Sequence, residues 1–261
     1  MTVIGAGAGE VVGDSPERRV EILSDHEHVH ATWTRYAPHR EGADLHIHRR
    51  HTDLFYVLEG ELTVRLGAAD EHVAAPAGTL VRVPPLVVHG FRNAGEGELR
   101  YLNFHAPGER FADYLRAMRD GRPFVYDQEP PPEDGGRPIT DAVIGGDGFS
   151  SDALRLLADV DEIAVAELSP MSGGEHVHAR HYEAYYVLEG SLEVMVEGRR
   201  HRADAGSWVA IPPGARHEVA GSSRVLNVHA PGGGFGEFVR ALADGDDEAA
   251  AAARAGFDQI S

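Results

Sequence analysis

The sequence predicts an all-β protein in which two β-barrels follow one another along the chain, each ending in a short helix. The first observation is an internal repeat, because residues 55–62 recur at residues 185–192. The second is that both halves contain short runs of β-branched and aromatic residues separated by Gly, Pro, Asp and Asn. The third is an amphipathic pattern near the end of each half. A duplicated barrel or sandwich with a terminal helix satisfies all three.

The strand signals have counterparts in both halves. Each run is short, apolar and bounded by turn residues, as is typical of strands in barrels. We expect strands at residues 54–58, 62–66, 80–83, 185–188, 192–196 and 208–211.

The helix signals also come in pairs. Apolar side chains recur at positions i, i+3, i+4 and i+7, which is the spacing of one helix face. The first set is Phe111, Tyr114, Leu115 and Met118, and the second is Phe235, Phe238, Val239 and Leu242. An alanine-rich segment at residues 244–255 predicts one more exposed helix. Each half then has an aromatic-Asp-Gln tripeptide, at residues 126–128 and 257–259, for which we expect a shared docking role.

A proline- and glycine-rich segment separates the two halves. Residues 129–136 suit neither a helix nor a strand and are typical of a linker. We therefore expect an N-terminal barrel at residues 1–138 and a C-terminal barrel at residues 139–261.

The composition excludes several functions. The 261 residues include 42 acidic and 24 basic ones, for a net charge of −18, and such a surface repels phosphate backbones and anionic lipid. We expect no nucleic-acid partner. The chain has no Lys and no Cys, which excludes Schiff-base chemistry, thiolate metal sites and disulfides. Any metal must therefore be held by imidazole and carboxylate.

The 16 histidines carry the strongest functional signal. Side chains at i and i+2 of a strand share a face, so His46 with His48, and His176 with His178, can chelate one ion. A carboxylate follows each pair, Asp53 in the first half and Glu183 in the second. It stands five residues after the second histidine, so it can lie on the adjacent strand and face the same site. A later histidine beyond a Pro-Pro turn, His89 or His217, completes three imidazoles and one carboxylate. Such a set suits Fe, Mn, Ni, Cu, Co or Zn as divalent ions and leaves coordination positions open.

The histidine pattern resembles that of the cupin superfamily. The resemblance occurs once in each half, so together the two copies span nearly the whole chain. The family's first motif, with two histidines, a glutamate and a closing glycine, is similar to residues 43–60 and 173–190. Its second motif, with a proline turn and a third histidine, is similar to residues 78–93 and 206–221. The resemblance implies tandem cupin jelly-roll β-barrels, each followed by a short C-terminal α-helix, and a divalent transition metal in each barrel. The implied ligands are His46, His48, Asp53 and His89 in the first barrel and His176, His178, Glu183 and His217 in the second.

The first half departs from the family pattern. Asp53 stands where the family has Glu, and Leu86 replaces a turn glycine, while Gly221 replaces an asparagine in the second half. Because Asp is one methylene shorter than Glu, we expect weaker metal binding in the first barrel than in the second.

The same strand parity predicts the walls of each pocket. Phe55 and Phe91 should face inward in the first half, and Tyr185 and Val219 in the second. His105 and His229 should either line the pocket or hydrogen-bond to its rim, and His51 and His181 should lie behind the ligands or in solvent. The outward residues 56, 58, 186 and 188 should pack between barrels, giving a monomer with pseudo-two-fold barrels or a homo-oligomer.

Three functions fit these residues. The resemblance favours a metal-dependent dioxygenase-like enzyme, similar to quercetinase, acting on a small, aromatic, oxygenated substrate. The second is a Lewis-acid isomerase, epimerase or decarboxylase, and the third is a non-catalytic small-molecule binding cupin. The sequence identifies no catalytic acid or base beyond the ligand carboxylate and the rim histidines.

The sequence also sets an expectation for location. It contains neither a leader pattern nor an apolar run long enough for a membrane span. We expect a cytoplasmic protein without a membrane partner, whose main partner is a small-molecule substrate.

Overall fold

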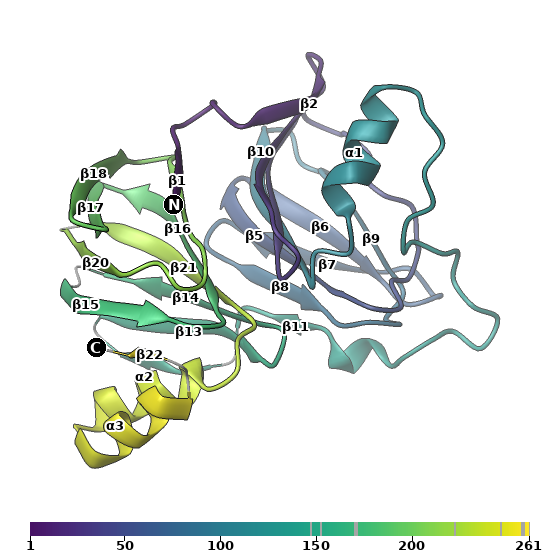
Figure 1. Cartoon of the computed structure of the whole chain (residues 1–261). Helices are drawn as coiled ribbons and strands as arrows, with labels where there is room; N and C mark the ends of the chain where they lie inside the picture. The colour runs from purple at the N-terminus through teal and green to yellow at the C-terminus, as the bar shows by residue number, and fades with distance from the viewer. Residues whose placement is uncertain are drawn as a thin grey trace. The chain divides into compact units, whose positions relative to one another are not determined.

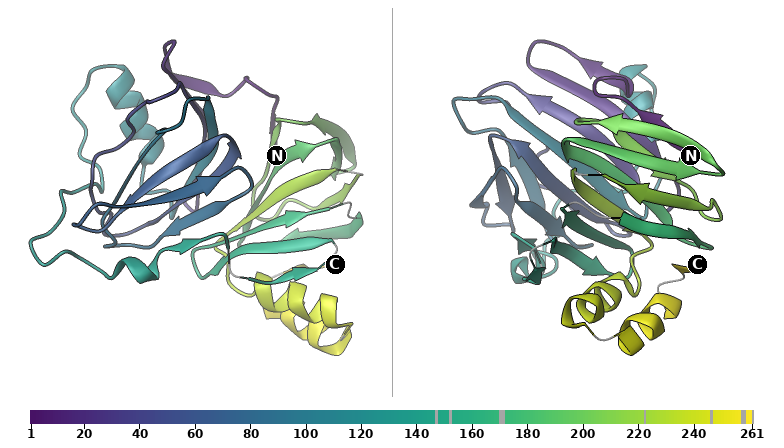
Figure 2. Two further views of the ribbon diagram at one scale, coloured as in Figure 1. Left: turned by 180° about the vertical axis from the view of Figure 1, so that it is seen from behind. Right: turned by 90° about the vertical axis from the view of Figure 1, so that its left-hand side faces the viewer.

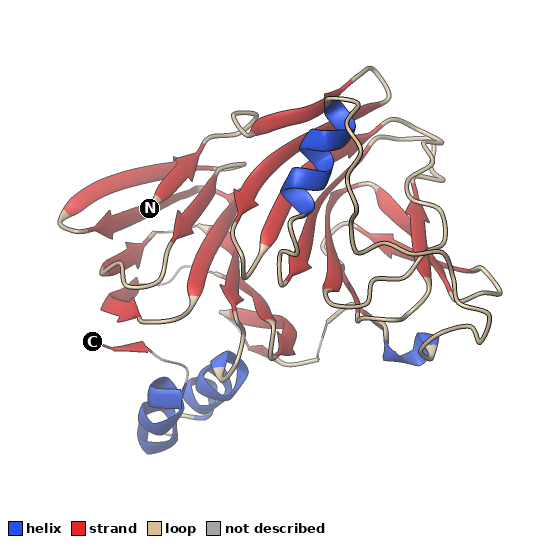
Figure 3. Cartoon of the chain, turned by 45° about the vertical axis from the view of Figure 1, so that its right-hand side comes forward, coloured by secondary structure: helices blue, strands red, loops and turns tan. Residues whose placement is uncertain are grey.

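The computed structural model shows two compact β-rich units, drawn in Figure 1. It describes the chain except residues 147, 152, 170–171, 222, 246, 257–258 and 261. One unit comprises residues 9–146, and the other comprises residues 1–8 and 147–261. Strands make up most of the regular secondary structure in both units, as the red ribbons of Figure 3 show. The predicted all-β, duplicated fold is confirmed.

The N-terminal barrel consists of a seven-stranded sheet, in the order β11-β8-β5-β10-β4-β3-β2, and a three-stranded sheet, β7-β6-β9. Helix α1 follows the last long strand, β10. The elements are β2 (Glu10–Asp14), β3 (Arg18–Asp25), β4 (His30–Tyr36), β5 (Thr52–Glu59), β6 (Glu61–Leu66), β7 (Glu71–Pro76), β8 (Leu80–Val83), β9 (His89–Arg92), β10 (Leu99–Ala106), α1 (Phe111–Arg119), a 3-10 turn (Ile139–Asp141) and β11 (Val143–Ile144).

The C-terminal barrel repeats this plan with a seven-stranded sheet, β1-β19-β16-β21-β14-β13-β12, and a five-stranded sheet, β18-β17-β20-β15-β22. Figure 2 shows α2 and α3 side by side at one end of this unit. The elements are β1 (Thr2–Ile4), β12 (Ser150–Ser151), β13 (Leu154–Val160), β14 (Ile163–Leu168), β15 (Ser172–His178), β16 (Tyr182–Glu189), β17 (Ser191–Val196), β18 (Arg199–Asp204), β19 (Trp208–Ile211), β20 (His217–Ala220), β21 (Arg224–Ala230), α2 (Phe235–Asp244), α3 (Asp247–Gly256) and β22 (Gln259–Ile260).

Alternating side chains of the central strands form the core of each barrel. Phe55 and Val57 of β5 are fully buried with Leu62 and Val64 of β6. Successive strand side chains point to opposite faces, so one face of each sheet supplies this interior. Burying one such side chain stabilises the fold by about 1.5–3 kcal/mol. The C-terminal barrel has an equivalent core around Val187.

The units differ from the predicted division at residue 138 in two places. Strand β11, which follows the linker, pairs with β8 of the N-terminal barrel at Val143 and Ile144. Strand β1 pairs antiparallel with β19 of the C-terminal barrel, with Val3 opposite Val209. Each barrel therefore takes its outermost strand from the other side of the linker in the sequence.

Candidate metal centres

Backbone pairing brings the first three histidines together. His46 and His89 exchange two hydrogen bonds, since each backbone N–H donates to the other's carbonyl over 2.9 Å. His48 follows His46 by two residues, and its carbonyl accepts from Leu86 N–H at 2.7 Å in the Pro-Pro turn. The turn therefore fixes the backbone between the His-x-His pair and the third histidine.

The carboxylate comes from the neighbouring strand. Asp53 lies on β5, directly opposite His105 of β10. Its Oδ2 lies 3.4 Å from His89 Nε2 and 3.8 Å from His48 Nε2, while His46 Nε2 lies 3.2 Å from His48 Nε2. One donor atom from each of these four buried residues lies within 4.8 Å of the others.

The hydrogen bonds of the imidazoles leave their lone pairs facing one point. His46 Nδ1 and His89 Nδ1 each lie within 2.9 Å of the carbonyl two residues earlier, Asp44 O and Val87 O. His48 Nδ1 contacts the carbonyl of Asp127. Because a carbonyl only accepts, each Nδ1 carries the proton and each Nε2 offers a lone pair. Metal-binding histidines are oriented in this way, so the four residues fit a divalent transition metal.

The protonation states suit the same purpose. Burial, and then His89 and His48, lower the pKa of His46 to about 3, so its imidazole is neutral near pH 7. Burial alone would raise the pKa of Asp53, but His105, His48 and His89 more than offset it and hold that pKa well below its usual range. The site therefore combines the neutral imidazole of His46 with an ionised carboxylate.

The C-terminal barrel repeats the arrangement on matching elements. His176 and His178 lie on β15, His176 pairs with His217 of β20, and Glu183 lies on β16 opposite His229. His176 Nδ1 donates to Gly174 O at 2.8 Å, which again leaves its Nε2 free to bind. His217 Nδ1 donates to Ala215 O at 3.0 Å, and its Nε2 points at Glu183. These four buried donors form the second group within 4.8 Å.

The two carboxylates reach their histidines differently. Glu183 Oε2 lies 2.7 Å from His217 Nε2, 3.5 Å from His178 Nε2 and 4.0 Å from His176 Nε2. Burial would raise the pKa of Glu183, but His229, His178 and His217 hold it well below the usual range. Burial likewise lowers the pKa of His217, yet the hydrogen bond to Glu183 raises it overall. The longer side chain gathers all three imidazoles around one oxygen.

Each centre opens into a cavity of a different size. The N-terminal cavity measures about 200 Å³ and is lined by Phe91, His105 and side chains of α1. The C-terminal cavity measures about 480 Å³ and is lined by Tyr185, Val219 and His229. Phe55 is instead buried beneath Phe91, with ring centroids 4.8 Å apart.

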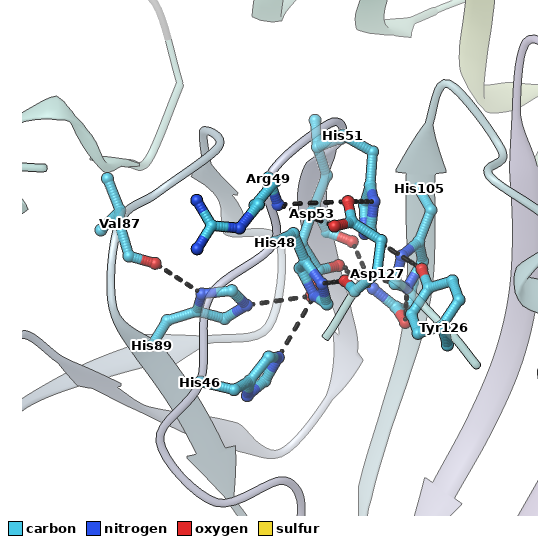
Figure 4. Close-up of polar contacts among 12 residues, drawn as sticks. His46, His48, Arg49, His51, Asp53, Val87, His89, His105, Tyr126 and Asp127 are labelled. Atoms are coloured by element: carbon cyan, nitrogen blue, oxygen red, sulfur yellow. Dashed lines mark hydrogen bonds and ion pairs between the residues drawn. The ribbon is translucent and has the colours of Figure 1, made fainter. Parts of the chain in front are cut away.

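Sequence reasoning expected a docking role for residues 126–128 but missed that two of them brace the first centre. The Asp127 carboxylate accepts from the backbone N–H of Arg49 and Arg50 and lies 3.1 Å from His51 Nδ1. Tyr126 Oη lies 3.0 Å from His51 Nε2. These contacts, shown in Figure 4, give the first aromatic-Asp-Gln tripeptide its docking role. The second tripeptide lies partly outside the described residues. The recurrence of the tripeptide in both halves was the one sequence signal for this role.

Amides also support both carboxylates. Asn103 Nδ2 donates to Asp53 Oδ1, and Asn227 Nδ2 donates to Glu183 Oε1. The hydroxyl of Tyr185 donates to the same Glu183 oxygen. Each carboxylate therefore keeps one oxygen for these donors and turns the other toward the histidines.

Comparison with known families identifies the chain. The family model described as "Cupin domain" matches residues 32–105 and again residues 164–229. The two matches cover more than half of the sequence and one lies in each barrel, so the chain belongs to the cupin family and is a bicupin. No curated protein sequence matches it.

Solved structures share the two-barrel architecture. Protein Ylba from E. coli aligns with a TM-score of 0.59 at 13% identity over 84% of this chain and 86% of its own. The salicylate 1,2-dioxygenase of Pseudaminobacter salicylatoxidans gives 0.59 at 14% identity over 88% and 83%. The oxalate decarboxylase of Lactobacillus farciminis gives 0.56 at 14% over 88% and 85%. At such identities the likeness establishes the fold alone.

None of the helices that the structure describes is both long and apolar enough to cross a bilayer.

Proposed function

We propose that the chain is a metal-dependent, dioxygenase-like enzyme whose reactive centre is the four-residue group of the C-terminal barrel. The observation that carries this proposal is that His176, His178, His217 and Glu183 converge beside a cavity of about 480 Å³, which the first two histidines and Glu183 line. A divalent transition metal held by these four residues would supply Lewis acidity and a route for reaction with dioxygen. Four protein ligands leave positions open for a small oxygenated molecule.

The cavity walls favour a small aromatic substrate. Tyr185, Val219, Phe235 and Phe238 line it, and these side chains offer flat, apolar surface to a planar ring. Arg254 lines the same cavity, with its guanidinium 5.4 Å from the centroid of the Phe238 ring. Because a guanidinium binds a carboxylate well, Arg254 supports a substrate that carries an acidic group.

The chain's own residues supply the remaining roles. Val219 and the aromatic walls exclude water from the substrate ring. Tyr185 and Asn227 hold Glu183 through hydrogen bonds to Oε1, which keeps Oε2 directed at the three imidazoles. Arg254 orients the substrate through its acidic group, and His229 lies at the cavity wall beside Glu183.

A second candidate is Lewis-acid decarboxylation or isomerisation of a small oxo-acid. Tyr185 favours it, because this buried phenol lies at the cavity wall and its hydrogen bond to Glu183 Oε1 offers a proton route between the carboxylate and a reacting molecule. Such a group can donate a proton to a reacting molecule without a change in metal oxidation state.

The decisive experiment combines element analysis with oxygen uptake. Protein purified without a His tag should contain a transition metal, and it should consume oxygen with hydroxylated benzoates or phenols. Glu183→Gln should abolish uptake and lower metal content, whereas the matched variant Asp53→Asn should spare uptake. Turnover under nitrogen would favour the second candidate. Metal-loaded protein that binds these molecules without turnover would contradict both and indicate a binding protein.

A further inference from the structure

We propose that the N-terminal barrel contains a second cation site, formed by His51, His105 and Tyr126, beside the four-residue centre. Three donor atoms meet there. His51 Nε2 lies 2.9 Å from His105 Nδ1, Tyr126 Oη lies 3.0 Å from His51 Nε2, and Tyr126 Oη lies 2.9 Å from His105 Nδ1. Figure 4 shows the three side chains on the far side of His48 from His46 and His89.

The surrounding hydrogen bonds fix where the protons of this cluster sit. His51 Nδ1 lies 3.1 Å from a carboxylate oxygen of Asp127, so Nδ1 carries the proton. His105 Nε2 lies 3.0 Å from Asn103 Oδ1, and that amide is oriented because its Nδ2 donates to Asp53 and to Leu54 O. His105 Nε2 therefore carries the proton of its ring. Both remaining ring nitrogens, His51 Nε2 and His105 Nδ1, present lone pairs.

The cluster contains too few hydrogen atoms to satisfy all of its acceptors. Two lone pairs and one phenol oxygen lie within 3.0 Å of each other, and the Tyr126 hydroxyl supplies a single hydrogen. That hydrogen can form a hydrogen bond to one of the two rings. The lone pair of the other ring then faces only acceptor atoms. Buried lone pairs at this distance repel one another unless a cation lies between them.

The spacing suits a metal ion. With metal–nitrogen distances of about 2.1 Å, neighbouring donors of an octahedral ion lie about 2.9 Å apart. The three observed separations match one face of such an octahedron. Asp127 behind His51 also supplies the carboxylate that typically orients a metal-binding imidazole. Tyr126 is half-buried, whereas His51 and His105 are buried.

His48 separates this cluster from the four-residue centre. By distance alone His48 groups with His51 and His105 as well as with His46. Its Nδ1 donates to Asp127 O, so its one lone pair is on Nε2, which lies 3.2 Å from His46 Nε2. His48 therefore belongs to the four-residue centre, and Tyr126 supplies the third donor of the new site.

The second half of the sequence provides an internal comparison. His181 and His229 stand at the positions of His51 and His105, but the tripeptide there begins with Phe257, which has no hydroxyl. Within the described part of the C-terminal barrel, the four-residue centre is the one group of possible metal ligands. Replacing Tyr126 by Phe therefore makes the first half like the second at this position.

Copper titration of the full chain tests the site without depending on catalysis. The background variant His46→Ala/His89→Ala/His176→Ala/His217→Ala removes two ligands from each four-residue centre. It should still bind one equivalent of Cu²⁺ and show a visible phenolate-to-copper absorption band. Adding Tyr126→Phe should weaken binding at least tenfold and abolish the band, and adding His51→Gln should also weaken binding. His26→Gln/His28→Gln, which changes neighbouring histidines outside the cluster, should leave the band unchanged.

The outcomes separate a metal site from a shared proton. If Tyr126→Phe leaves affinity unchanged and the parent shows no band, the three residues share an extra proton and the proposal is wrong. Far-ultraviolet circular dichroism establishes that the background variant is folded. If it is not, the same comparison is made in the otherwise native chain, where Tyr126→Phe should lower total bound copper by one equivalent while the C-terminal centre keeps its ion. An unchanged total there would also overturn the proposal.

Discussion

Leu86 and Gly214 occupy the same position in the Pro-Pro turns of the two barrels, with left-handed φ angles of 69° and 79°. Each backbone N–H donates to the carbonyl of the second histidine, His48 or His178, over 2.7 Å. Glycine adopts this conformation freely, whereas a side chain makes it costly. The turn that supports the first centre is therefore strained at Leu86.

Relief of this strain should stabilise the protein. Leu86→Gly should raise the free energy of unfolding by about 1 kcal/mol, measured by urea denaturation. Gly214→Ala should lower it by a similar amount, because a Cβ there meets no atom within 4 Å and only the backbone conformation matters. A loss of stability in Leu86→Gly would show that contacts of the half-exposed leucine outweigh the strain.

The two centres should hold metal unequally. Glu183 Oε2 lies within 4.0 Å of all three imidazoles, whereas Asp53 Oδ2 has such contacts with His48 and His89. His176→Ala/His178→Ala should therefore remove more of the tightly bound metal than His46→Ala/His48→Ala, measured by element analysis after dialysis. Equal losses would contradict the inequality.

Lengthening the first carboxylate should reduce that difference. Asp53→Glu should raise metal occupancy of the N-terminal centre, because the extra methylene extends the oxygen toward His46. Competition dialysis against a chelator measures the change, which we expect to be about tenfold in affinity. The reverse variant, Glu183→Asp, serves as the matched control and should weaken the C-terminal centre. Unchanged affinity in Asp53→Glu would mean that the backbone of β5 already compensates.

Acid should destabilise the protein through His30. This imidazole is 1% exposed, and neither ring nitrogen has a hydrogen-bond partner among the described residues. Burial, and then Arg116 and His51, lower its pKa from 6.5 to about 3. The unfolded chain therefore binds a proton that the folded chain refuses, and stability present above pH 6.5 is lost as the pH falls toward 3.

The size of this effect can be measured. One such group should lower the free energy of unfolding by about 2 kcal/mol between pH 6.5 and pH 5. Urea denaturation at the two pH values should show a smaller loss in His30→Leu, which removes the titrating group but keeps the apolar surroundings. An identical loss in both proteins would assign the acid sensitivity to other residues.

Removal of the first strand should weaken the C-terminal barrel. Strand β1 covers the edge of β19, and Met1 and Val3 pack against the core of that barrel. Deletion of residues 1–8 should lower its stability by about 1–3 kcal/mol, because the apolar contacts of these residues are lost. Hydrogen exchange at Trp208–Ile211 should become faster, whereas exchange at β5 should not change. Equal exchange in both proteins would show that β1 contributes little.

Local patterns predicted the fold class, six of the strands and the helices. The six expected strand runs lie in β5, β6, β8, β16, β17 and β19, and the three expected helices are present. Other strands were not predicted. Among them are the edge strands β7 and β18, where polar residues such as Glu71 and Arg199 replace the apolar pattern. The pairing of β1 with β19 joins residues far apart in sequence, and no local pattern records it.

The sequence predicted the ligands of the candidate centres but not the contacts that support them. The eight proposed ligands could be named because a duplicated spacing repeats them, and the structure brings them into two groups of four. The roles of Tyr126 and Asp127 depend on contacts with His51, 75 and 76 residues earlier. Such contacts follow from the path of the chain around the barrel, which residue spacing does not encode.

The exchange of outer strands has a consequence for biosynthesis. Residues 2–4 leave the ribosome about 200 residues before their pairing partner, residues 208–210, which emerges only after the N-terminal barrel has been made. Until then this segment has an unpaired edge that another polypeptide can occupy. Completion of the sheet therefore waits until residues 208–210 have been made, and a nascent chain that stalls before them leaves residues 2–4 unpaired.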